Sequence, residues 1–457
     1  MSEFRIEHDT MGEMRVPIDA LYGAETQRAV ENFPISRMRF GRAFLSALGL
    51  VKFAAAQANR RTGILHPPLA GAIETAAQEV MEGRHDAQFV VDVFQTGSGT
   101  STNMNANEVI STRATALLGK PVHPNDHVNR SQSSNDVFPT ALHIAAARTA
   151  HEMLLPAMDA LHRALDGKRQ QFWEILKIGR THLQDAVPMR LGQEFGGYAR
   201  QVELSQARIR KALDDLYELP LGGTAVGSGL NAAPGFAPDA MVIIAERTGL
   251  PFREAQNHFE AQAARDAVVF LSGALKSYAI ALTKIANDIR WLGSGPRCGI
   301  GELHLPEVQP GSSIMPGKVN PVIAESVLMV CAQVVGHDAT ISWAAAAGAF
   351  ELNTMMPVIA YDLLESIELL AAASRNFSER CILGLEANEA RLRDTIEQSL
   401  ALATALTPEI GYERAAALAK VAYQSGRTIR EVAEEQSGIE QHKLAKLLDP
   451  MKMVGPR

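Results

Sequence analysis

Residues 257–292 form a long segment without proline in which apolar side chains recur every third or fourth position. This period is that of an α-helix with an apolar face, and at 1.5 Å per residue it predicts a helix roughly 50 Å long. The apolar positions are Ala264, Val268, Leu271, Leu275, Ala279, Leu282, Ile285 and Ile289. The stretch AVVFLSGAL at 267–275 is apolar on more than one face, so the helix must be covered on every side. We therefore expect another subunit to supply part of that cover.

Helix-forming residues also dominate the remainder of the chain. Ala, Leu, Glu, Gln and Arg are frequent, whereas alternating β-branched runs bounded by turns are nearly absent. Long helical patterns cover 138–170, 188–217 and 319–347, which predicts a mainly α protein with an elongated central bundle. A chain of 457 residues is long for one core. We expect three domains: 1–135, mostly helical; 136–356, the long-helix bundle; and 357–457, small and helical.

The overall charge and the cysteines exclude several classes of protein. A net charge of −7 and a pI near 6.0 argue against a nucleic-acid binder. Cys298, Cys331 and Cys381 are too few for a disulfide framework and lack the C-x-x-C spacing of zinc or iron–sulfur sites. The start, MSEFRIEHDT, has no targeting character, and no uninterrupted apolar run reaches the ~20 residues of a membrane span. We expect a cytoplasmic protein without membrane partners.

Four polar segments interrupt the helical patterns and hold the candidate functional residues. The first is TGSGTSTNMNANEV, 96–109. Ser98, Thr100 and Ser101 are typical N-cap residues for a helix that begins there. A helix N-terminus with free N–H groups is also an anion site, so a binding role stays open.

The second segment is HPNDHVNRSQSSNDVFPTALHIAA, 123–146. His123 and His127 are four residues apart with Asp126 between them, so a metal site has to be considered. Pro124 and the neighbouring asparagines instead favour a turn over the helix that pairs such ligands. SQSSND holds more hydroxyls and amides than one N-cap needs, which indicates hydrogen bonds to a ligand.

The third segment is GRTHLQDAVPMRLGQEF, 179–195, with His182 between a charged helix end and a new helix start. A lone histidine is more often structural than catalytic, but this position makes the two interpretations about equal.

The fourth segment is GSSIMPGKVNPV, 311–322. Gly311 and Gly317 permit close backbone approach to a ligand, Lys318 offers a compact cation for a carboxylate, and Asn320 both donates and accepts hydrogen bonds. A flexible surface loop with one lysine is the competing interpretation.

The familiar motifs of several enzyme classes are missing. The chain has no G-x-S-x-G and no P-loop, and GSGPRCGIG does not follow a strand as a dinucleotide-binding loop would.

The polar segments resemble those of the fumarase/aspartase superfamily, specifically the class II (iron-independent) fumarate hydratases. GSSIMPGKVNP matches the superfamily signature without a gap. The other matching segments occur in the expected order: GSGT, HPNDHVN, SQSSND, GRTHLQD, LGGTAVGSGLN, GPRCGIGE and GAFELN. The likeness extends from RIEHDTMGE at residue 5 to MVGP near the end of the chain.

This resemblance implies a homotetramer of three-domain, mostly helical subunits. The central helices would pool into a shared core, and loops of three subunits would build each active site. The family chemistry is the reversible anti elimination of water from (S)-malate to give fumarate, without a metal or organic cofactor.

The resemblance also implies a role for each matching residue. Ser312 would be the base, its pKa lowered by donors in the loop, and Lys318, Asn320 and the loop backbone would stabilise the aci-carboxylate. His182 would protonate the leaving hydroxyl directly or through water, oriented by Glu325. The matching substrate-binding positions are Ser98, Gly99, Thr100, Ser133, Ser134, Asn135, Thr181, Ser313, Lys318, Val319 and Asn320. A second dicarboxylate site would comprise His123, Pro124, Asn125 and Asp126.

Three alternatives compete with fumarate hydration. Aspartate ammonia-lyases share most of these motifs, and Ser101–Thr102 is not the pair expected of a typical fumarase. SQSSND, LGGTAVGSGLN and GAFELN favour fumarase. Argininosuccinate and adenylosuccinate lyases differ in the PGKVN stretch. A catalytically silent structural homologue would be expected to lack Ser312, His182 or Lys318, and all three are present.

Overall fold

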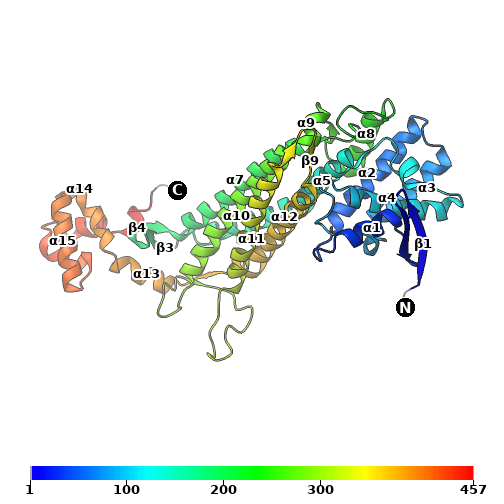
Figure 1. Cartoon of the computed structure of the whole chain (residues 1–457). Helices are drawn as coiled ribbons and strands as arrows, with labels where there is room; N and C mark the ends of the chain where they lie inside the picture. Colours follow the sequence, from blue (N-terminus) through cyan, green and yellow to red (C-terminus); the bar gives the residue numbers. More distant parts are fainter. Residues whose placement is uncertain (1–2, 456–457) are drawn as a thin grey trace. The chain divides into compact units, whose positions relative to one another are not determined.

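The computed structural model describes residues 3–455, which fold mainly into helices joined by loops and two-stranded sheets (Figure 1). The mainly α prediction is confirmed. The chain divides into two compact units, each made of three separate segments. Unit 1 holds residues up to Pro156, Ser205–Ala279 and Cys331–Ala371, and unit 2 holds Ala157–Leu204, Ile280–Val330 and the residues from Ala372 onward. The three-domain division stays a prediction.

Unit 1 begins with an antiparallel hairpin and continues with packed helices. Helix α2 contacts α3, α5 and α8. Phe40 stacks on Phe44 in the core, and the Phe138 ring lies edge-on or tilted against both. The elements that lie mainly in this unit are β1 (Phe4–Asp9), β2 (Gly12–Pro17), α1 (Ala24–Asn32), α2 (Arg42–Arg61), α3 (Pro67–Met81), α4 (Thr100–Leu118), α5 (Ser134–Thr149), β5 (Glu218–Leu219), α8 (Phe236–Thr248), β6 (Arg253–Glu254), α9 (His258–Ala263), β8 (Gly348–Ala349) and β9 (Leu352–Asn353).

Unit 2 contains a second hairpin and a group of short helices. Ile178 of the hairpin packs into an apolar core with Leu402, Leu418 and Val432 of the C-terminal helices. The elements that lie mainly in this unit are α6 (Leu155–Gln171), β3 (Leu176–Thr181), β4 (Gln184–Arg190), β7 (Leu303–His304), β10 (Glu386–Ala387), α13 (Glu389–Gln398), α14 (Thr407–Ile410), α15 (Tyr412–Ser425), α16 (Ile429–Gln436) and α17 (Gln441–Leu447).

Four long helices contribute residues to both units: α7 (Leu191–Leu216), α10 (Asp266–Leu292), α11 (Val322–Ala345) and α12 (Met356–Phe377). The helix predicted over 138–170 is confirmed and continues through a π-helical turn at Ala150–Leu154, whereas the helix predicted over 319–347 begins three residues later, at Val322. The start predicted at 188 is wrong by three residues, because 188–190 belong to β4.

The single helix predicted over 257–292 is also wrong. It is interrupted at Ala264, whose backbone is extended, with φ −89° and ψ 155°. The part that follows, α10, has the predicted apolar face, and its members from Val268 to Ile289 are buried.

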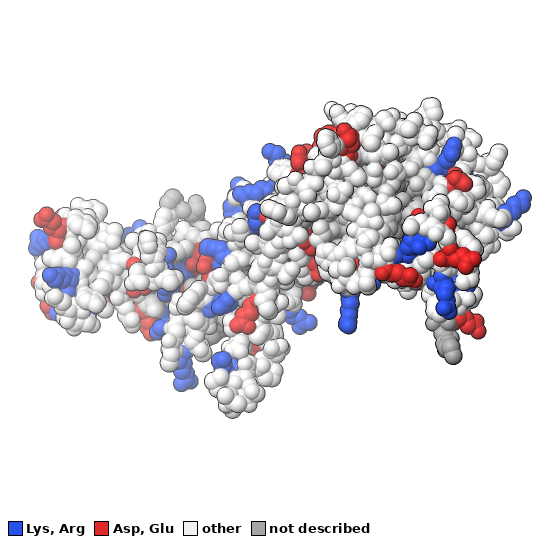
Figure 2. Space-filling view, viewed as in Figure 1, with Lys and Arg blue, Asp and Glu red and all other residues white. Residues whose placement is uncertain are grey.

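Helices α10 and α11 leave large apolar side chains uncovered. Phe270 and Ile280 of α10 are exposed, as are Met329, Val335 and Trp343 of α11. Both helices are long and apolar enough to cross a membrane by length and composition, a test that a core helix of a soluble protein also passes. Charged residues of both signs are interspersed on the visible face of the molecule (Figure 2).

Candidate active site

The N-termini of helices α4 and α5 meet in unit 1 through a chain of hydroxyl groups. The Ser98 and Thr100 hydroxyl oxygens are 2.8 Å apart, and Thr100 Oγ1 is 2.7 Å from Ser134 Oγ. Ser98 precedes α4 in the chain, and its side chain is buried. Because no side chain caps the N-terminus of α4, its first N–H groups are free there, and the cluster suits an anion such as a carboxylate.

Gly99 is the N-cap of α4, and no side chain caps this helix. The prediction that Ser98, Thr100 or Ser101 supplies the cap is therefore wrong. Gly99 has φ 75°, and a Cβ there would lie 2.0 Å from a ring carbon of Phe138. The positive φ and the close Phe138 ring both require glycine at position 99. The neighbouring Ser98 and Thr100 hydroxyls do not cap the helix and instead hydrogen-bond to each other.

One hydroxyl of SQSSND caps α5, as the sequence predicts. Ser133 Oγ accepts the Asn135 N–H at 3.2 Å, and Asp136 Oδ1 accepts the Ser133 N–H at 2.9 Å, which completes a capping box. The Asn135 side chain donates from Nδ2 to the Ala225 carbonyl at 2.8 Å. The LGGTAVGSGLN segment is thereby held against the start of α5.

Asp136 is a structural residue whose role sequence reasoning missed. Its carboxylate is fully buried, and Oδ2 accepts the backbone N–H groups of Gly222 at 3.0 Å and Thr224 at 2.9 Å. Burial raises the pKa of Asp136 to about 6, against the opposing effect of these N–H groups and of Lys52. The residue joins two of the signature segments.

Lys52 lies behind the same loop and was also missed. It is 0% exposed, and Nζ donates to Asn129 Oδ1 and Gln132 Oε1, each at 3.0 Å. Burial lowers the pKa of Lys52 to about 7. A single lysine inside the apolar run LGLVKFAAA was the signal that could have revealed it.

His123 to Asp126 form a compact, exposed turn. His123 Nδ1 accepts the N–H groups of Asn125 at 3.2 Å and Asp126 at 3.1 Å, and His127 Nδ1 accepts the His123 N–H at 2.8 Å. The turn expected here is a five-residue π-helical turn, Pro124–Val128. Within residues 3–455, no group of three or more His, Cys, Asp or Glu side chains is placed to hold one metal ion.

His182 lies in unit 2 at the tip of the β3–β4 hairpin. The prediction that it lies between two helices is wrong, because Thr181 pairs with Gln184 across a two-residue turn. His182 and Leu183 have φ 56° and 61°, a backbone region that costs non-glycine residues energy. Both side chains are exposed, so the hairpin presents them outward from the chain.

Buried ion pairs anchor the stem of this hairpin. Arg180 Nη2 is 2.6 Å from Glu302 Oε1, and Lys177 Nζ is 3.2 Å from Glu302 Oε2 and 2.7 Å from Glu194 Oε2. Glu302 is 0% exposed. Since Arg180 belongs to GRTHLQD and Glu302 to GPRCGIGE, these pairs explain why the two segments occur together.

Ser312 receives backbone hydrogen bonds within its own loop. Its Oγ accepts the N–H groups of Met315 at 3.0 Å and Ile314 at 3.3 Å. Asn320 Nδ2 donates to the Gly311 carbonyl at 2.7 Å and closes the base of the loop. Gly311 is required there, because a Cβ would lie 2.1 Å from the Lys318 carbonyl oxygen.

A cavity of about 670 Å³ adjoins this loop in unit 2. Lys318, Val319 and Asn320 line it together with Glu325, which lies in the first turn of α11. Within residues 3–455, no described hydrogen bond joins His182 to Ser312 or to Glu325. The candidate residues thus form separate groups: the hydroxyl cluster at the N-termini of α4 and α5 lies in unit 1, and the His182 hairpin and the Ser312 loop lie in unit 2.

Comparison with known proteins shows what these groups belong to. Residues 12–336 match the family model described as "Lyase", and 402–455 match "Fumarase C C-terminus". The chain is 53% identical over 460 residues to the class II fumarate hydratase of Methylorubrum extorquens, covering 99% of this chain and 98% of that protein. The chain belongs to the class II fumarate hydratase family. The Mycobacterium tuberculosis member is 56% identical over 94% of this chain and 91% of its own length.

Solved structures of class II fumarate hydratases and related lyases have the same fold. The class II fumarase from Schistosoma mansoni superposes with a TM-score of 0.97 at 40% identity, covering 100% of both chains. A fumarate lyase:delta crystallin from Brucella melitensis gives 0.95 at 46% identity, over 99% of this chain and 100% of that one. The family and the fold that the motifs implied are confirmed, and so is the expectation of a lyase.

Proposed function

We propose that this chain catalyses the reversible hydration of fumarate to (S)-malate. Full-length identity of 50–56% to proteins named fumarate hydratase supports this activity. The observation that carries the mechanism is the Ser312 hydroxyl, which accepts two backbone N–H groups on a loop that also bears Lys318 and Asn320.

Ser312 acts as the base in the malate-to-fumarate direction. It removes the proton from the carbon next to a carboxylate, which places extra negative charge on that carboxylate. The N–H groups of Ile314 and Met315 stabilise the serine as an alkoxide before the transfer. Lys318 and Asn320 stabilise the aci-carboxylate, and such preorganised donors supply the largest part of catalysis in many enzymes.

His182 donates a proton to the leaving hydroxyl, directly or through a water molecule, and Glu325 orients the imidazole. Elimination is anti, so acid and base act on opposite faces of the substrate. Glu302 holds the stem of the β3–β4 hairpin through Lys177 and Arg180, and so fixes the position of His182 at its tip.

Each active site is assembled from loops of three subunits in a homotetramer. Support comes from the three separate groups of candidate residues, none of which holds base, acid and carboxylate site together. The exposed apolar side chains of α10 and α11 supply surfaces for association. The enzyme acts in the cytoplasm.

The substrate carboxylates bind at the paired helix N-termini and at the serine loop. The contacting residues are Ser98, Gly99, Thr100, Ser133, Ser134, Asn135, Thr181, Ser313, Lys318, Val319 and Asn320. The turn His123, Pro124, Asn125 and Asp126 forms a second dicarboxylate site. The reaction is a proton transfer and an elimination, which these side chains can perform without a cofactor.

The test follows the ultraviolet absorbance of fumarate with malate, and then aspartate, as the sole substrate. Turnover of malate supports the proposal, turnover of aspartate alone would replace it with ammonia elimination, and turnover of neither would leave a structural homologue. Ser312→Ala should nearly abolish turnover with the oligomer intact. Ser313→Ala is the matched control, and it should raise KM with a smaller change in kcat.

A further inference from the structure

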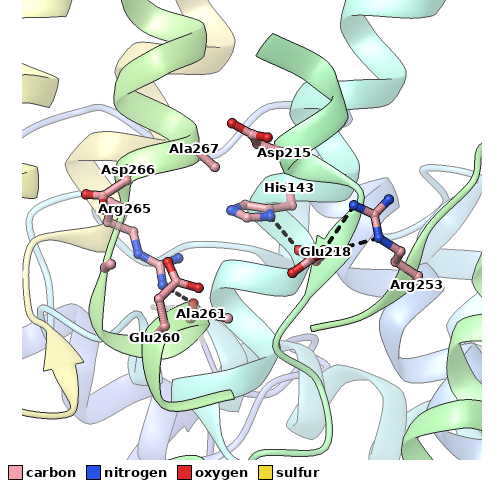
Figure 3. Close-up of a pocket in the computed structure, with 10 residues that line it drawn as sticks. His143, Asp215, Glu218, Arg253, Glu260, Ala261, Arg265, Asp266 and Ala267 are labelled. Carbon is pink, nitrogen blue, oxygen red and sulfur yellow. Dashed lines mark hydrogen bonds and ion pairs between the residues drawn. The ribbon is translucent and has the colours of Figure 1, made fainter. Parts of the chain in front are cut away.

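A second polar cavity, of about 240 Å³, lies in unit 1 at the break between α9 and α10. His143 of α5, Glu218 of β5 and Arg253 of β6 face it from one side, and Glu260, Arg265 and Asp266 from the other (Figure 3). None of the proposed catalytic or substrate-contacting residues lines it. Its size is below the roughly 300–1,000 Å³ of pockets for drug-sized ligands, so it suits a molecule of a few heavy atoms.

The floor of this cavity holds a guanidinium group that is largely unpartnered. Arg265 is 2% exposed, and its Nη2 donates to the Ala261 carbonyl oxygen. Within the described residues, Nε and Nη1 make no hydrogen bond, although both are buried donors. Burial lowers the pKa of Arg265 to about 10, with Glu260 and Asp266 opposing that effect, so the group remains charged at neutral pH. A buried, charged guanidinium with two free donors favours a carboxylate ligand.

The histidine beside it is neutral and does not compete for that carboxylate. His143 Nδ1 lies 3.0 Å from the Glu218 carbonyl oxygen, so this nitrogen carries the hydrogen and donates. Burial, and then the charge of Arg265, lower the pKa of His143 to about 4. The floor therefore offers one positive charge.

The rim of the cavity has the opposite charge. Asp215, Glu260 and Asp266 are exposed around the opening, whereas Glu218 is paired with Arg253 at 3.2 Å. Burial raises the pKa of Glu260, and the neighbouring Arg265 guanidinium opposes that effect. A simple anion entering the cavity would pass three carboxylates, and a simple cation would meet Arg265.

We propose that this cavity binds a small zwitterion of the α-amino acid class. The carboxylate accepts hydrogen bonds from Arg265 Nε and Nη1, and the ammonium group donates to the rim carboxylates. Such a ligand places its carboxylate against Arg265 and its ammonium group against the acidic rim, whereas a simple anion or a simple cation satisfies only one of the two. The proposal does not depend on fumarate hydration.

The test compares glycine with its two halves, acetate and methylammonium, by calorimetric titration of the full-length protein. Glycine should bind at least about tenfold more tightly than either half. Arg265→Met should weaken glycine binding roughly tenfold to a hundredfold, as expected for loss of a charged hydrogen-bond donor. It should also raise the melting temperature, because an unpaired buried charge is removed. Arg253→Met is the matched control, because that guanidinium is paired with Glu218, and the variant should retain glycine binding.

Three results would overturn the proposal. Acetate binding as tightly as glycine would make this a simple anion site. A change in sedimentation of Arg265→Met would mean that a carboxylate of a second copy occupies the cavity. Absence of glycine binding at tens of millimolar would remove the zwitterion altogether. Fumarate turnover, measured separately, should be unchanged in Arg265→Met, so failure here is distinguishable from failure of the proposed activity.

Discussion

Lys52→Met should abolish one component of the pH dependence of stability. Lys52 is fully buried, and its Nζ donates to the side-chain oxygens of Asn129 and Gln132. A neutral amine has two N–H donors, and both are used. In the folded protein the neutral amine therefore keeps all its donor hydrogen bonds, whereas the charged form also carries the cost of desolvation.

The magnitude follows from the shift in pKa. Burial lowers the pKa of Lys52 from 10.5 to about 7, so between these values the unfolded chain binds a proton that the folded chain does not. The contribution of neutral Lys52 to the free energy of unfolding is therefore largest above about pH 10.5, and it falls by about 1.4 kcal/mol per pH unit down to pH 7. Raising the pH from about 7.5 to 9.5 should add about 2–3 kcal/mol to the free energy of unfolding. Asp136 titrates below this window, because its pKa is about 6.

The assay is urea unfolding at a fixed protein concentration across this pH range, with wild type and variant compared at each pH. Other groups titrate equally in both proteins, so the difference isolates residue 52. Gln132→Leu is the control: it breaks one hydrogen bond of Lys52 and lowers stability by about 1 kcal/mol, but it keeps the slope. An identical slope in Lys52→Met and wild type would refute the reasoning.

Three further predictions concern the loops and the exposed faces. Gly99→Ala should lower the free energy of unfolding by about 1–3 kcal/mol and raise KM, because the new Cβ would clash with the buried Phe138 ring. Gly119→Ala, at a position that also has positive φ but no atom within 4 Å of the added Cβ, should lower the melting temperature less. Glu302→Gln should lower kcat roughly 10- to 100-fold with little change in circular dichroism, because a buried charge that holds the β3–β4 hairpin is lost. Trp343→Glu should lower the sedimenting mass, whereas Tyr423→Glu, similarly exposed on α15, should not.

Periodicity predicted the long helices well because burial of an apolar face decides where they form. The break at Ala264 had no local signal: EAQAARDAVV contains neither glycine nor proline. Tertiary contacts caused it instead, since the buried Gln262 side chain donates to the Thr224 carbonyl at 2.9 Å and Arg265 turns inward. A contact across nearly forty residues cannot be inferred from helical propensity.

The β3–β4 hairpin escaped prediction for a different reason. Two-residue hairpin turns usually contain Asn-Gly or Asp-Gly, and this turn is His182–Leu183. Pro188, which lies inside β4, also argues against a strand. The motif order identified His182 as a candidate, but only the structure placed it on a hairpin stabilised by buried ion pairs.

Two charged groups whose pKa values burial shifts strongly, Lys52 and Asp136, lie behind the SQSSND segment. Lys52 and Asp136 support the SQSSND segment, and Glu302 supports the hairpin, whereas Ser312 and His182 lie on loops outside these buried clusters. A search for shifted pKa values would therefore have selected Lys52 and Asp136, which hold a loop in place. The proposed tetramer supplies a physical cause for this division: buried ion pairs hold loops at defined positions, and a site that neighbouring subunits complete leaves its reacting groups uncovered in the single chain. On this reasoning, association both covers the apolar faces of α10 and α11 and encloses the substrate, so subunits separated by Trp343→Glu should lose turnover in proportion to the tetramer lost.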